Sequence, residues 1–512
     1  MRRGFAIAES AERMDEPAQY RVGSITLSEE FPGVWTIPPG QPGAVSARLI
    51  ADRAALPTFG DDRTLDQLKG AAALPAMIEP VVCLPDGHQG YGFPVGGVGA
   101  SPLSDGIISP GAVGYDINCG VRLLRTSLTE AELEESAAEL TDALAANIPA
   151  GMGGDGVIRL DAESLEAILE SGIGWAVEAG YATADDEVHC EDGGVHPAAD
   201  PAAVSTTAQD RGRTQAGSLG SGNHFLEVQV VDEVFDADVA SRFGITSDQV
   251  VVMIHCGSRG LGHQVCRDYL DAIAEAPDTV VDGDLAAVRI DSDIGQAYHG
   301  AMAAAVNYAW VNRQLLTHQV RQVFGKVFGR SWRSLGMELV YDVAHNIAKV
   351  EDHRVHQSPS GLQLSPPGEG GESIPLMVHR KGATRAFPSG HPAVPETYRE
   401  VGQPVLLPGS MGTASYVLVG GSASMGLTFG STAHGAGRRL SRTAARNKYD
   451  GSSLRSSLLS EQGIHIAATT DATIAEEAPG VYKDVDAVVA SSDAVGIASP
   501  VARCRPVCNV KG

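Results

Sequence analysis

The pattern of apolar and polar positions predicts two amphipathic helices. In residues 127–145 (SLTEAELEESAAELTDALA), apolar side chains recur at helical spacing, and Thr129 and Glu132 are placed as a capping box at the start of the helix. Residues 300–325 carry a second, longer helical pattern that begins at Gly300. Both segments are long enough for stable helices within a folded protein.

Short runs of β-branched residues predict strands between such helices. The runs at 250–255 (VVVMIH) and 404–409 (PVLLPG) lead into loops that carry polar residues. Residues 357–375 are rich in Gly, Pro and Ser, which indicates a hairpin tip or an insertion rather than a domain linker. Alternation of helices and short strands indicates an α+β or an α/β protein, with no evident domain boundary after about residue 80.

Composition narrows the class of protein. The 512 residues are 43% hydrophobic and 20% charged, with a net charge of −25. This balance is typical of a globular protein and argues against a general nucleic-acid coat protein, although it permits an enzyme with one basic groove. No run of 18 apolar residues predicts a membrane helix. The start (MRRGFAIAESAERMDE) turns acidic before an apolar segment develops, and seven cysteines form no disulfide framework, so we expect a cytoplasmic location.

Histidine, aspartate and cysteine recur within glycine-rich loops. The segments are PDGHQGYGFPVGG (85–97), GYDINCGVR (114–122), GSLGSGNHFLEV (217–228), HCGSRGLGHQV (255–265), YDVAHNIAKVE (341–351) and HGAGR (434–438). A single histidine is more often structural than catalytic. Several such loops together predict one active site, because glycine lets the backbone approach a ligand closely.

One of these loops contains potential metal ligands. Asp116 and Cys119, with histidines from other loops, would supply oxygen, thiolate and imidazole donors. Taken alone, this set suits zinc best, followed by Mn²⁺ or Fe²⁺. The alternative is that Cys119 is a buried apolar residue, as intracellular cysteines often are. We interpret the cysteines at positions 83, 190, 256 and 266 as structural, and for Cys504 and Cys508 a redox or metal role stays open.

Two further loops resemble anion-binding nests rather than dinucleotide fingerprints. Neither a G-x-G-x-x-G turn nor a Walker P-loop is present. The loops 408–415 (PGSMGTAS) and 434–437 (HGAG) offer runs of backbone N–H groups. We expect the second loop to open a helix in which Arg438, Arg442 and Arg446 share one face. This acid-free basic window favours either a solvated helix face or a nucleotide or nucleic-acid contact.

These motifs, in this order, closely resemble the RtcB family of tRNA-splicing RNA ligases. The likeness also includes HRKGATRAFP (379–388), PGSMGTASY (408–416) and the terminal VKG (510–512). It runs from about residue 60 to Gly512, so we expect an N-terminal extension over 1–60 and a ligase catalytic domain over 61–512. The resemblance implies an α+β fold built around a deep metal- and nucleotide-binding cleft.

The resemblance also implies a reaction. Family members join RNA that ends in a 2′,3′-cyclic phosphate or 3′-phosphate to RNA with a 5′-hydroxyl, using GTP and two Mn²⁺ ions, through GMP–histidine and RNA-ppG intermediates. The expected partners are tRNA halves or broken RNA ends, with an archease-like activator as a further partner and no membrane. For the metal, the resemblance favours Mn²⁺ over zinc.

Site residues follow from the matched motifs. His434 resembles the nucleophile that takes GMP from GTP, and Cys119 resembles a thiolate that bridges two ions. Asp116 and His224 would complete one ion's ligands, and His255 and His345 the other's, with Asp86 supporting this site from close by. The expected guanylate-binding residues are Asn223, His224, Phe225, Leu226, Glu227, His345, Asn346, Pro408, Gly409, Ser410, Met411, Ser415, His434, Gly435, Ala436, Gly437 and Lys511.

Two departures from the family pattern are small. Ala433 replaces a cysteine often found before the nucleophile, and Cys256 stands where many members have Thr or Ser. Two other classes of function remain as alternatives. A metallohydrolase would use the same Asp, Cys and His residues without a covalent nucleotide, and a non-enzymatic GTP- or RNA-binding module would have no use for the metal ligands.

Overall fold

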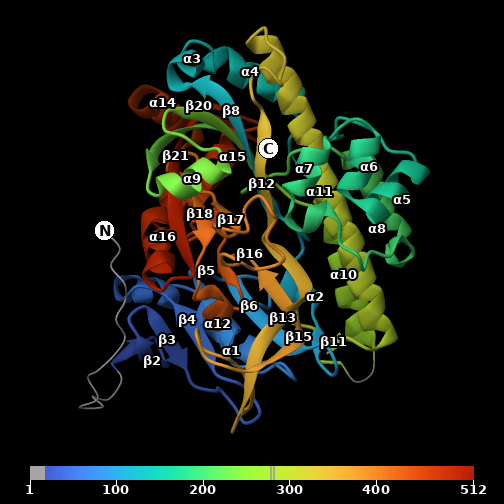
Figure 1. The fold of residues 1–512 in the computed structure, drawn as a ribbon, viewed down its shortest axis with the longest axis vertical. Helices are drawn as coiled ribbons and strands as arrows, with labels where there is room; N and C mark the ends of the chain where they lie inside the picture. Colours follow the sequence, from blue (N-terminus) through green and yellow to red (C-terminus); the bar gives the residue numbers. More distant parts are fainter. Residues whose placement is uncertain (1–17, 152, 277–278, 281–282) are drawn as a thin grey trace.

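The computed structural model describes residues 18–151, 153–276, 279–280 and 283–512. The first 17 residues, on which the argument against a secretory signal rests, lie outside the described part. Within that part, two large sheets and a surrounding set of helices form the fold (Figure 1). This arrangement confirms the expected α+β class.

The first large sheet contains the N-terminal strands. Its strands, in spatial order, are β1 (Gln19–Val22), β2 (Ile25–Phe31), β3 (Val34–Ile37), β4 (Ala47–Ile50), β5 (Val81–His88), β6 (Val95–Pro102), β15 (Glu372–Lys381), β13 (Asn346–Ser358) and β14 (Gly361–Leu364). Strand β4 pairs in parallel with β5, so the region that we expected to be an extension shares a sheet with the motif that contains Asp86. The hairpin from β13 through β14 to β15 confirms the hairpin expected over 357–375.

The second large sheet has the order β12 (Glu338–Ala344), β8 (Gly120–Thr129), β10 (Gln249–Cys256), β9 (Phe225–Val234), β21 (Ala498–Lys511), β18 (Ser415–Gly420) and β17 (Pro404–Leu407), with β20 (His465–Ala468) beside β21. Strands β10 and β17 confirm the two predicted strands. Two small pairs complete the strands: β7 (Ile107–Ile108) with β11 (Val288–Arg289), and β16 (Ala383–Arg385) with β19 (Ser431–Ala433).

Helices cover the sheets and occupy the connections. They are α1 (Thr64–Ala72), α2 (Pro110–Val113), α3 (Glu130–Glu134), α4 (Ala137–Asn147), α5 (Ala162–Ser171), α6 (Ile173–Glu178), α7 (Ala184–Val188), α8 (Thr206–Gln215), α9 (Ala237–Phe243), α10 (Arg259–Glu275), α11 (Asp293–Val327), α12 (Ser424–Thr428), α13 (Arg442–Lys448), α14 (Gly451–Gln462), α15 (Asp471–Glu476) and α16 (Val485–Ala494). Short 3₁₀ helices lie at η1 (Arg53–Gly60), η2 (Glu191–Gly194), η3 (Pro201–Ala203) and η4 (Pro479–Val481).

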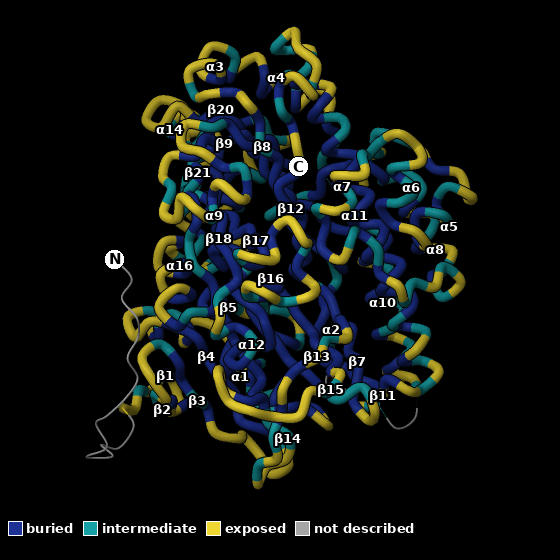
Figure 2. The backbone as a smooth tube through the Cα atoms, in the orientation of Figure 1, coloured by how far each residue is buried: buried dark blue, intermediate teal, exposed yellow. Residues whose placement is uncertain are grey.

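Helix α11 includes the predicted helix over 300–325 and is the main buried helix. Most of its residues from Gly295 to Phe324 are buried, and Figure 2 shows the same for the central strands of both sheets, whereas β1, β2 and β14 at the ends of the first sheet are more exposed. Arg313, near its middle, is fully buried and binds Asp342 of β12 with N–O distances of 2.7 to 3.0 Å. The same guanidinium donates to the carbonyl oxygens of Asn118 and Cys256, each at 2.8 Å. A buried charge therefore fixes the ends of strands next to the metal-ligand loop.

The helix predicted over 127–145 is divided in the structure. The Thr129–Glu132 capping box is present, but residues up to Thr129 belong to β8, and α3 and α4 are separate helices. The apolar positions before Thr129 are strand positions, which helical spacing over so short a run does not distinguish.

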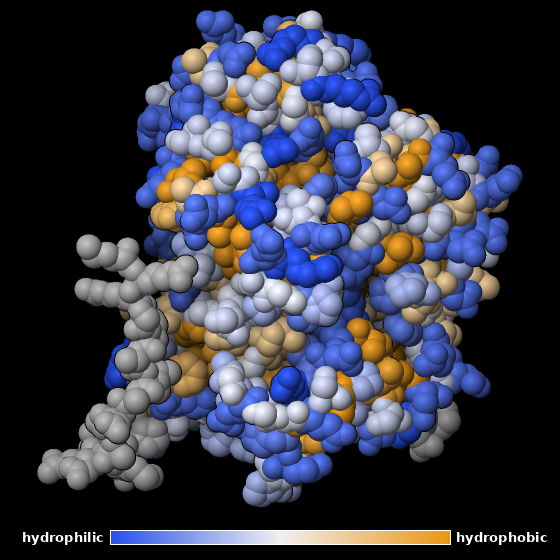
Figure 3. Space-filling model, viewed as in Figure 1, coloured by the Kyte–Doolittle hydropathy of each residue, from blue (hydrophilic) through white to orange (hydrophobic). Residues whose placement is uncertain are grey.

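The face of the molecule in Figure 3 is largely hydrophilic, with apolar side chains in small separate groups. No helix among the described residues is long and apolar enough to cross a membrane. The seven cysteines are free and buried. Cys504 and Cys508 pack into two different hydrophobic clusters, so the structure does not bring their thiols together as a site.

Candidate metal and nucleotide site

The strand register gathers the motif residues at one edge of the second sheet. His255 of β10 pairs with Val121 of β8 on one side and with Phe225 of β9 on the other. Lys511, at the end of β21, also pairs with Phe225. Because antiparallel neighbours alternate in direction, strand beginnings and strand ends meet at this edge. Residues that are almost 400 positions apart in the sequence are therefore neighbours.

His345 marks the point where the chain passes between the two large sheets. It lies between β12 of the second sheet and β13 of the first. Its backbone N–H donates to the Cys119 carbonyl at 2.7 Å, and its carbonyl accepts from Ala383 at 3.1 Å. The strand that starts at Ala383 pairs with β19, which ends immediately before His434. The metal-ligand loop and His434 are thus connected through the main chain around His345.

Three side-chain donors form a compact cluster. The ligand atoms of Cys119, His224 and His255 lie within 4.8 Å of one another, and all three residues are buried. Cys119 Sγ is 3.3 Å from His224 Nε2 and 3.2 Å from His255 Nε2. The Asp116 Oδ2 atom is 2.8 Å from the same His224 nitrogen. The structure therefore brings together four of the five expected metal ligands around one thiol.

His345 is adjacent to this cluster. Its ring centroid lies 5.7 Å from that of His255 and 5.3 Å from that of His434. Its Nδ1 atom is 2.7 Å from the Thr384 hydroxyl, which leaves Nε2 directed elsewhere. His345 Nε2 and the Asp116 Oδ1 atom are among the buried atoms of the described residues that have no hydrogen-bond partner. Potential ligand atoms that lack a hydrogen-bond partner, next to a thiol and two imidazoles, fit a divalent transition metal ion, which would bind them.

Glycines permit this close approach. A Cβ at Gly220 would lie 1.8 Å from His224 Nδ1, and a Cβ at Gly257 would lie 2.4 Å from Asp116 Oδ1. Any side chain at either position would displace a ligand. This is the physical reason for small residues in two of the motifs.

Electrostatics differ among the clustered groups. Burial raises the pKa of the Cys119 thiol to about 12, so without a cation the sulfur keeps its proton. Burial lowers the pKa of His255 and of His345 well below the usual histidine value, so both imidazoles are neutral. For His224, burial is outweighed by Cys256, Cys119 and Asp116, which raise its pKa. Neutral imidazoles are the form that binds a metal ion.

His434 lies beside the cluster and is oriented by Asp86 of β5. Asp86 Oδ2 is 2.6 Å from His434 Nδ1 and also accepts the His434 backbone N–H at 3.0 Å. Although burial alone would raise the pKa of the Asp86 carboxyl, interaction with His434 lowers it. Asp86 thus contacts His434 itself, a role more specific than the support of the metal site that the sequence suggested. Pairing at Nδ1 leaves Nε2 of His434 with the lone pair.

A polar group at the start of β9 and the end of β21 surrounds Glu227. Its carboxylate accepts from Gln229 Nε2 at 2.7 Å and from the side-chain amide of Asn509. Gln229 also donates to Ser415 Oγ at 3.0 Å, and that hydroxyl accepts from the Gly409 N–H at 3.1 Å. Glu227, Gly409 and Ser415, expected guanylate-binding residues from two motifs, are therefore in one hydrogen-bonded network.

Lys511 closes this group from the C-terminus. Its ammonium lies 3.7 Å from Glu477 and 5.7 Å from the centre of the Phe225 ring, and donates to the Gly222 carbonyl at 3.4 Å. Burial lowers the pKa of Lys511, against the effect of Glu477 and Glu227. A buried lysine beside a carboxylate is an arrangement that can recognise a polar ligand.

Other expected residues have different surroundings. Leu226, Met411 and Ala436 place their side chains in hydrophobic clusters, so only their backbone could contact a ligand. The Asn223 carbonyl lies 3.1 Å from His255 Nδ1. The remaining members, Pro408, Ser410, Gly435 and Gly437, belong to the two loops that follow β17 and β19.

Asn346 joins two segments of the site. Its side-chain amide donates to the Asp116 carbonyl at 3.0 Å and accepts from the Gly382 N–H at 2.7 Å. This contact fixes the metal-ligand loop against the turn before Thr384.

The predicted start of the helix in the basic segment that contains Arg438, Arg442 and Arg446 is wrong. Helix α13 begins at Arg442 with Ser441 as its N-cap, so Arg438 is not on a shared helical face. The Arg438 guanidinium instead binds Glu477 at 2.8 Å. Arg442 approaches the site differently, because a Cβ added at Gly222 would lie 2.1 Å from its Nη2. The window therefore reaches the loop that precedes Asn223 and His224, through a side chain rather than a helix N-terminus.

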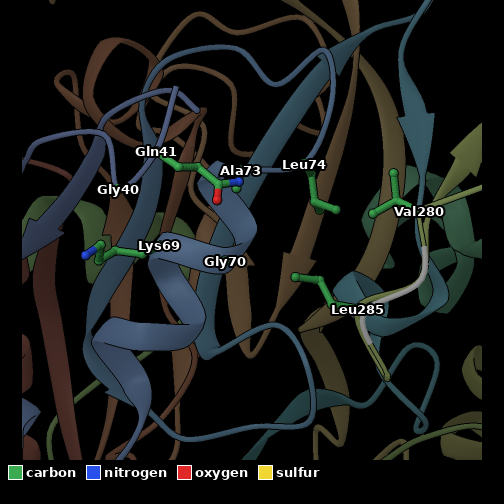
Figure 4. Close-up of a pocket in the computed structure, with 8 residues that line it drawn as sticks. All are labelled: Gly40, Gln41, Lys69, Gly70, Ala73, Leu74, Val280 and Leu285. Atoms are coloured by element: carbon green, nitrogen blue, oxygen red, sulfur yellow. The ribbon is translucent and has the colours of Figure 1, made fainter. Parts of the chain in front are cut away.

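Sequence reasoning missed four supporting residues. Thr384, Gln229, Asn509 and Glu477 contact His345, Glu227 or Lys511 as described above. Thr384 and Asn509 lie inside or next to quoted motifs, but nothing in their spacing indicated a partner. A separate cavity of about 380 Å³ lies beside α1, lined by residues that include Lys69, Val280 and Leu285 (Figure 4). It contains none of the candidate site residues.

Fold and donor cluster together define a site suited to a metal-dependent enzyme. A family model described as tRNA-splicing ligase RtcB matches residues 67–512. The chain belongs to this ligase family. Relatives named tRNA-splicing ligase RtcB include one from Thermococcus kodakarensis, 51% identical, which covers 91% of this chain and 95% of the relative. A relative from Pyrobaculum aerophilum is 48% identical, and the alignment covers 94% of this chain and 98% of the relative. A relative from Archaeoglobus fulgidus is also 48% identical, with 93% of this chain and 97% of the relative covered.

Proposed function

We propose that this chain is a GTP- and Mn²⁺-dependent RNA ligase that joins 2′,3′-cyclic phosphate or 3′-phosphate ends to 5′-hydroxyl ends. The observation that carries the proposal is the Asp86–His434 pair, placed next to the Cys119, His224 and His255 cluster. The ring of His345 contacts both His434 and His255 of the cluster, so a nucleophile lies close to a cation site. Together the two features suit phosphoryl chemistry better than either feature alone.

His434 is the proposed guanylate carrier. Its Nε2 attacks the α-phosphorus of GTP, an N–P bond forms, and the bond to the bridging oxygen breaks with departure of pyrophosphate. The Asp86 carboxylate holds the Nδ1 proton and stabilises the positive charge that develops on the ring. Two ions held by Asp116, Cys119, His224, His255 and His345 would neutralise charge on the phosphates. Next, the RNA 3′-phosphate displaces the histidine to give RNA-ppG, and the 5′-hydroxyl then displaces GMP.

Glu227 is the proposed reader of guanine. Its two carboxylate oxygens can accept the ring N–H and the exocyclic amine of guanine, a pair of donors that adenine lacks. In the structure these oxygens are occupied by Gln229 and Asn509, so guanine would share or replace those donors. Lys511 lies 5.7 Å from the centre of the Phe225 ring and would supply a charge for a polar group of the nucleotide.

The metallohydrolase alternative makes a distinct prediction, because it requires neither GTP nor His434 as a carrier. RNA strands ending in 3′-phosphate and 5′-hydroxyl are incubated with the protein, Mn²⁺ and either GTP or ATP. We expect a joined product with GTP but not with ATP, and we expect His434→Ala to form no joined product. Hydrolysis without joining would support the alternative.

The same assay with Zn²⁺ in place of Mn²⁺ decides between the metal that the donors favour and the metal that the family favours. Addition of an archease-like protein tests whether an activator is needed.

A further inference from the structure

An aromatic group borders the candidate site on the side of Asp116. We propose that Tyr91, Tyr115 and His263 form a platform on which the terminal base of an RNA end stacks, so that the reacting 3′-phosphate or 5′-hydroxyl of that end reaches the metal cluster. This proposal rests on the proposed ligase function. It concerns how an RNA end is positioned, which the residues that contact GTP or metal do not explain.

Three motifs contribute one ring each. The Tyr91 and Tyr115 ring centroids lie 6.0 Å apart at an interplanar angle of 90°. Tyr115 and His263 are 5.8 Å apart and inclined by only 24°. Tyr115 directly precedes Asp116 in the sequence, and the Asp116 side chain is 17% exposed. A partly exposed candidate metal ligand therefore directly follows one of the three rings in the sequence.

Exposure of Tyr91 needs an explanation. It is 67% exposed, the highest value among exposed large hydrophobic residues in the described part of the chain. Aromatic residues are only 5% of this sequence, and most of them are partly or fully buried. His263 is also exposed, whereas Tyr115 is half-buried. Exposed aromatic faces next to a phosphate-chemistry site are typical of single-stranded nucleic-acid binding, because every base can stack.

Contacts with Lys381 and Asp284 hold the segments that carry Tyr91 and Tyr115 in place. Lys381 donates to the backbone carbonyls of Tyr91 and Gly111, which ties the Tyr91 loop to α2. The Tyr115 hydroxyl donates to Asp284 at 2.9 Å. A Cβ at Gly92 would lie 2.6 Å from the Asp284 backbone, so that residue packs closely against the same loop. A loop backbone and a Tyr115 ring fixed in this way lose little entropy when a base stacks beside them.

Basic side chains flank the rings. Arg267 is exposed and lies one helical turn after His263 on α10, at a spacing that places both on one face. Arg211 of α8 is exposed and packs against Gly260 of α10, 3.3 Å from the position of an added Cβ. In a chain of charge −25, these cations beside aromatic rings favour a polyanion with bases over an acidic peptide, which would have no use for the stacking faces.

The test measures binding of RNA ends in the presence of Mn²⁺. Fluorescent ten-nucleotide RNAs end either in a 3′-phosphate or in a 5′-hydroxyl, and each is made with a normal or an abasic terminal nucleotide. We expect Tyr91→Ala to weaken binding of one normal end by about tenfold. The wild-type protein should bind the abasic form of that end more weakly than the normal form, by a similar factor. Wild type and Tyr91→Ala should bind the abasic form equally well. The arm that shows this dependence identifies the end that stacks.

Control variants separate stacking from structural damage. Tyr91→Phe keeps the ring and should bind like wild type. Phe31→Ala should also bind like wild type, because it removes an exposed ring from β2, a strand three places from β5 in the sheet order. Transfer of GMP from GTP to the protein involves no RNA and should be unchanged in Tyr91→Ala. If Tyr91→Ala binds both ends like wild type, or loses normal and abasic ends equally, the platform is wrong while the ligase proposal stands. If wild type neither joins nor binds RNA, the ligase proposal fails and the platform with it.

Discussion

Asp86 Oδ2 lies 2.6 Å from His434 Nδ1, and this contact joins the first large sheet to the loop after β19. The pair sets which ring nitrogen is available for attack. Asp86→Asn keeps the shape of the side chain but removes the charge and permits the wrong tautomer. We expect GMP transfer to slow by about 100-fold or more. Single-turnover labelling with GTP measures the rate, and an unchanged rate would show that Asp86 does not orient the nucleophile.

Cys119 contacts both histidines of the cluster, whereas His345 lies at its margin. Cys119→Ala should therefore remove a ligand shared by two ions and reduce metal content at both positions, while His345→Ala should weaken one. Elemental analysis after gel filtration measures the stoichiometry. Equal metal content in wild type and Cys119→Ala would contradict a bridging thiolate.

Glu227 gives a pH-dependent prediction. Burial raises its pKa to about 7, and protonation removes one of the two acceptors that guanine requires. GTP affinity should therefore fall as the pH decreases from 8 to 6, and Glu227→Gln should bind weakly throughout. Because the folded pKa is above the unfolded value, the contribution of this group to stability is present below about pH 4.5 and is lost as the pH rises through about 7. Calorimetric titration of GTP at several pH values tests the first statement, and a flat profile in wild type would contradict it.

The terminal lysine can be removed without leaving a buried charge alone. Glu477 retains Arg438 at 2.8 Å when Lys511 is absent. A chain that ends at Val510 should fold, because β21 retains most of its pairing with β9. We expect it to require about tenfold more GTP, since a desolvated charge next to the nucleotide is lost. If the chain that ends at Val510 forms the GMP adduct at the same GTP concentration as the full chain, Lys511 has no part in nucleotide binding.

Sequence patterns predicted the long helix α11, the strands β10 and β17 and the β13–β15 hairpin, because each has a strong local periodicity or turn signal. The start of α13 was not predictable, since Arg438 leaves the helical pattern to bind Glu477, which lies 39 positions away in the sequence. The division of the 127–145 segment depends on the pairing of β8 with β10, a long-range contact. The ligand types were visible in the motifs. Their supporting contacts, such as Thr384 with His345, depend on how two sheets meet, which no local pattern encodes.

The central claim is that His434 carries GMP and that the ions serve the later step as well. A synthetic RNA-ppG end already contains the activated phosphate, so its joining to a 5′-hydroxyl strand needs metal but no nucleophilic histidine. Cys119→Ala should fail with this substrate, and a folded His434→Ala protein should still join it.

Labelling with radioactive GTP and Mn²⁺, followed by a denaturing gel and acid treatment, is the most direct measurement of the carrier role. We predict an acid-labile GMP label on the wild-type protein and none on His434→Ala, together with joining of the RNA-ppG end by His434→Ala. A GMP label that persists on His434→Ala would contradict the account, as would failure of that folded variant to join the pre-activated end.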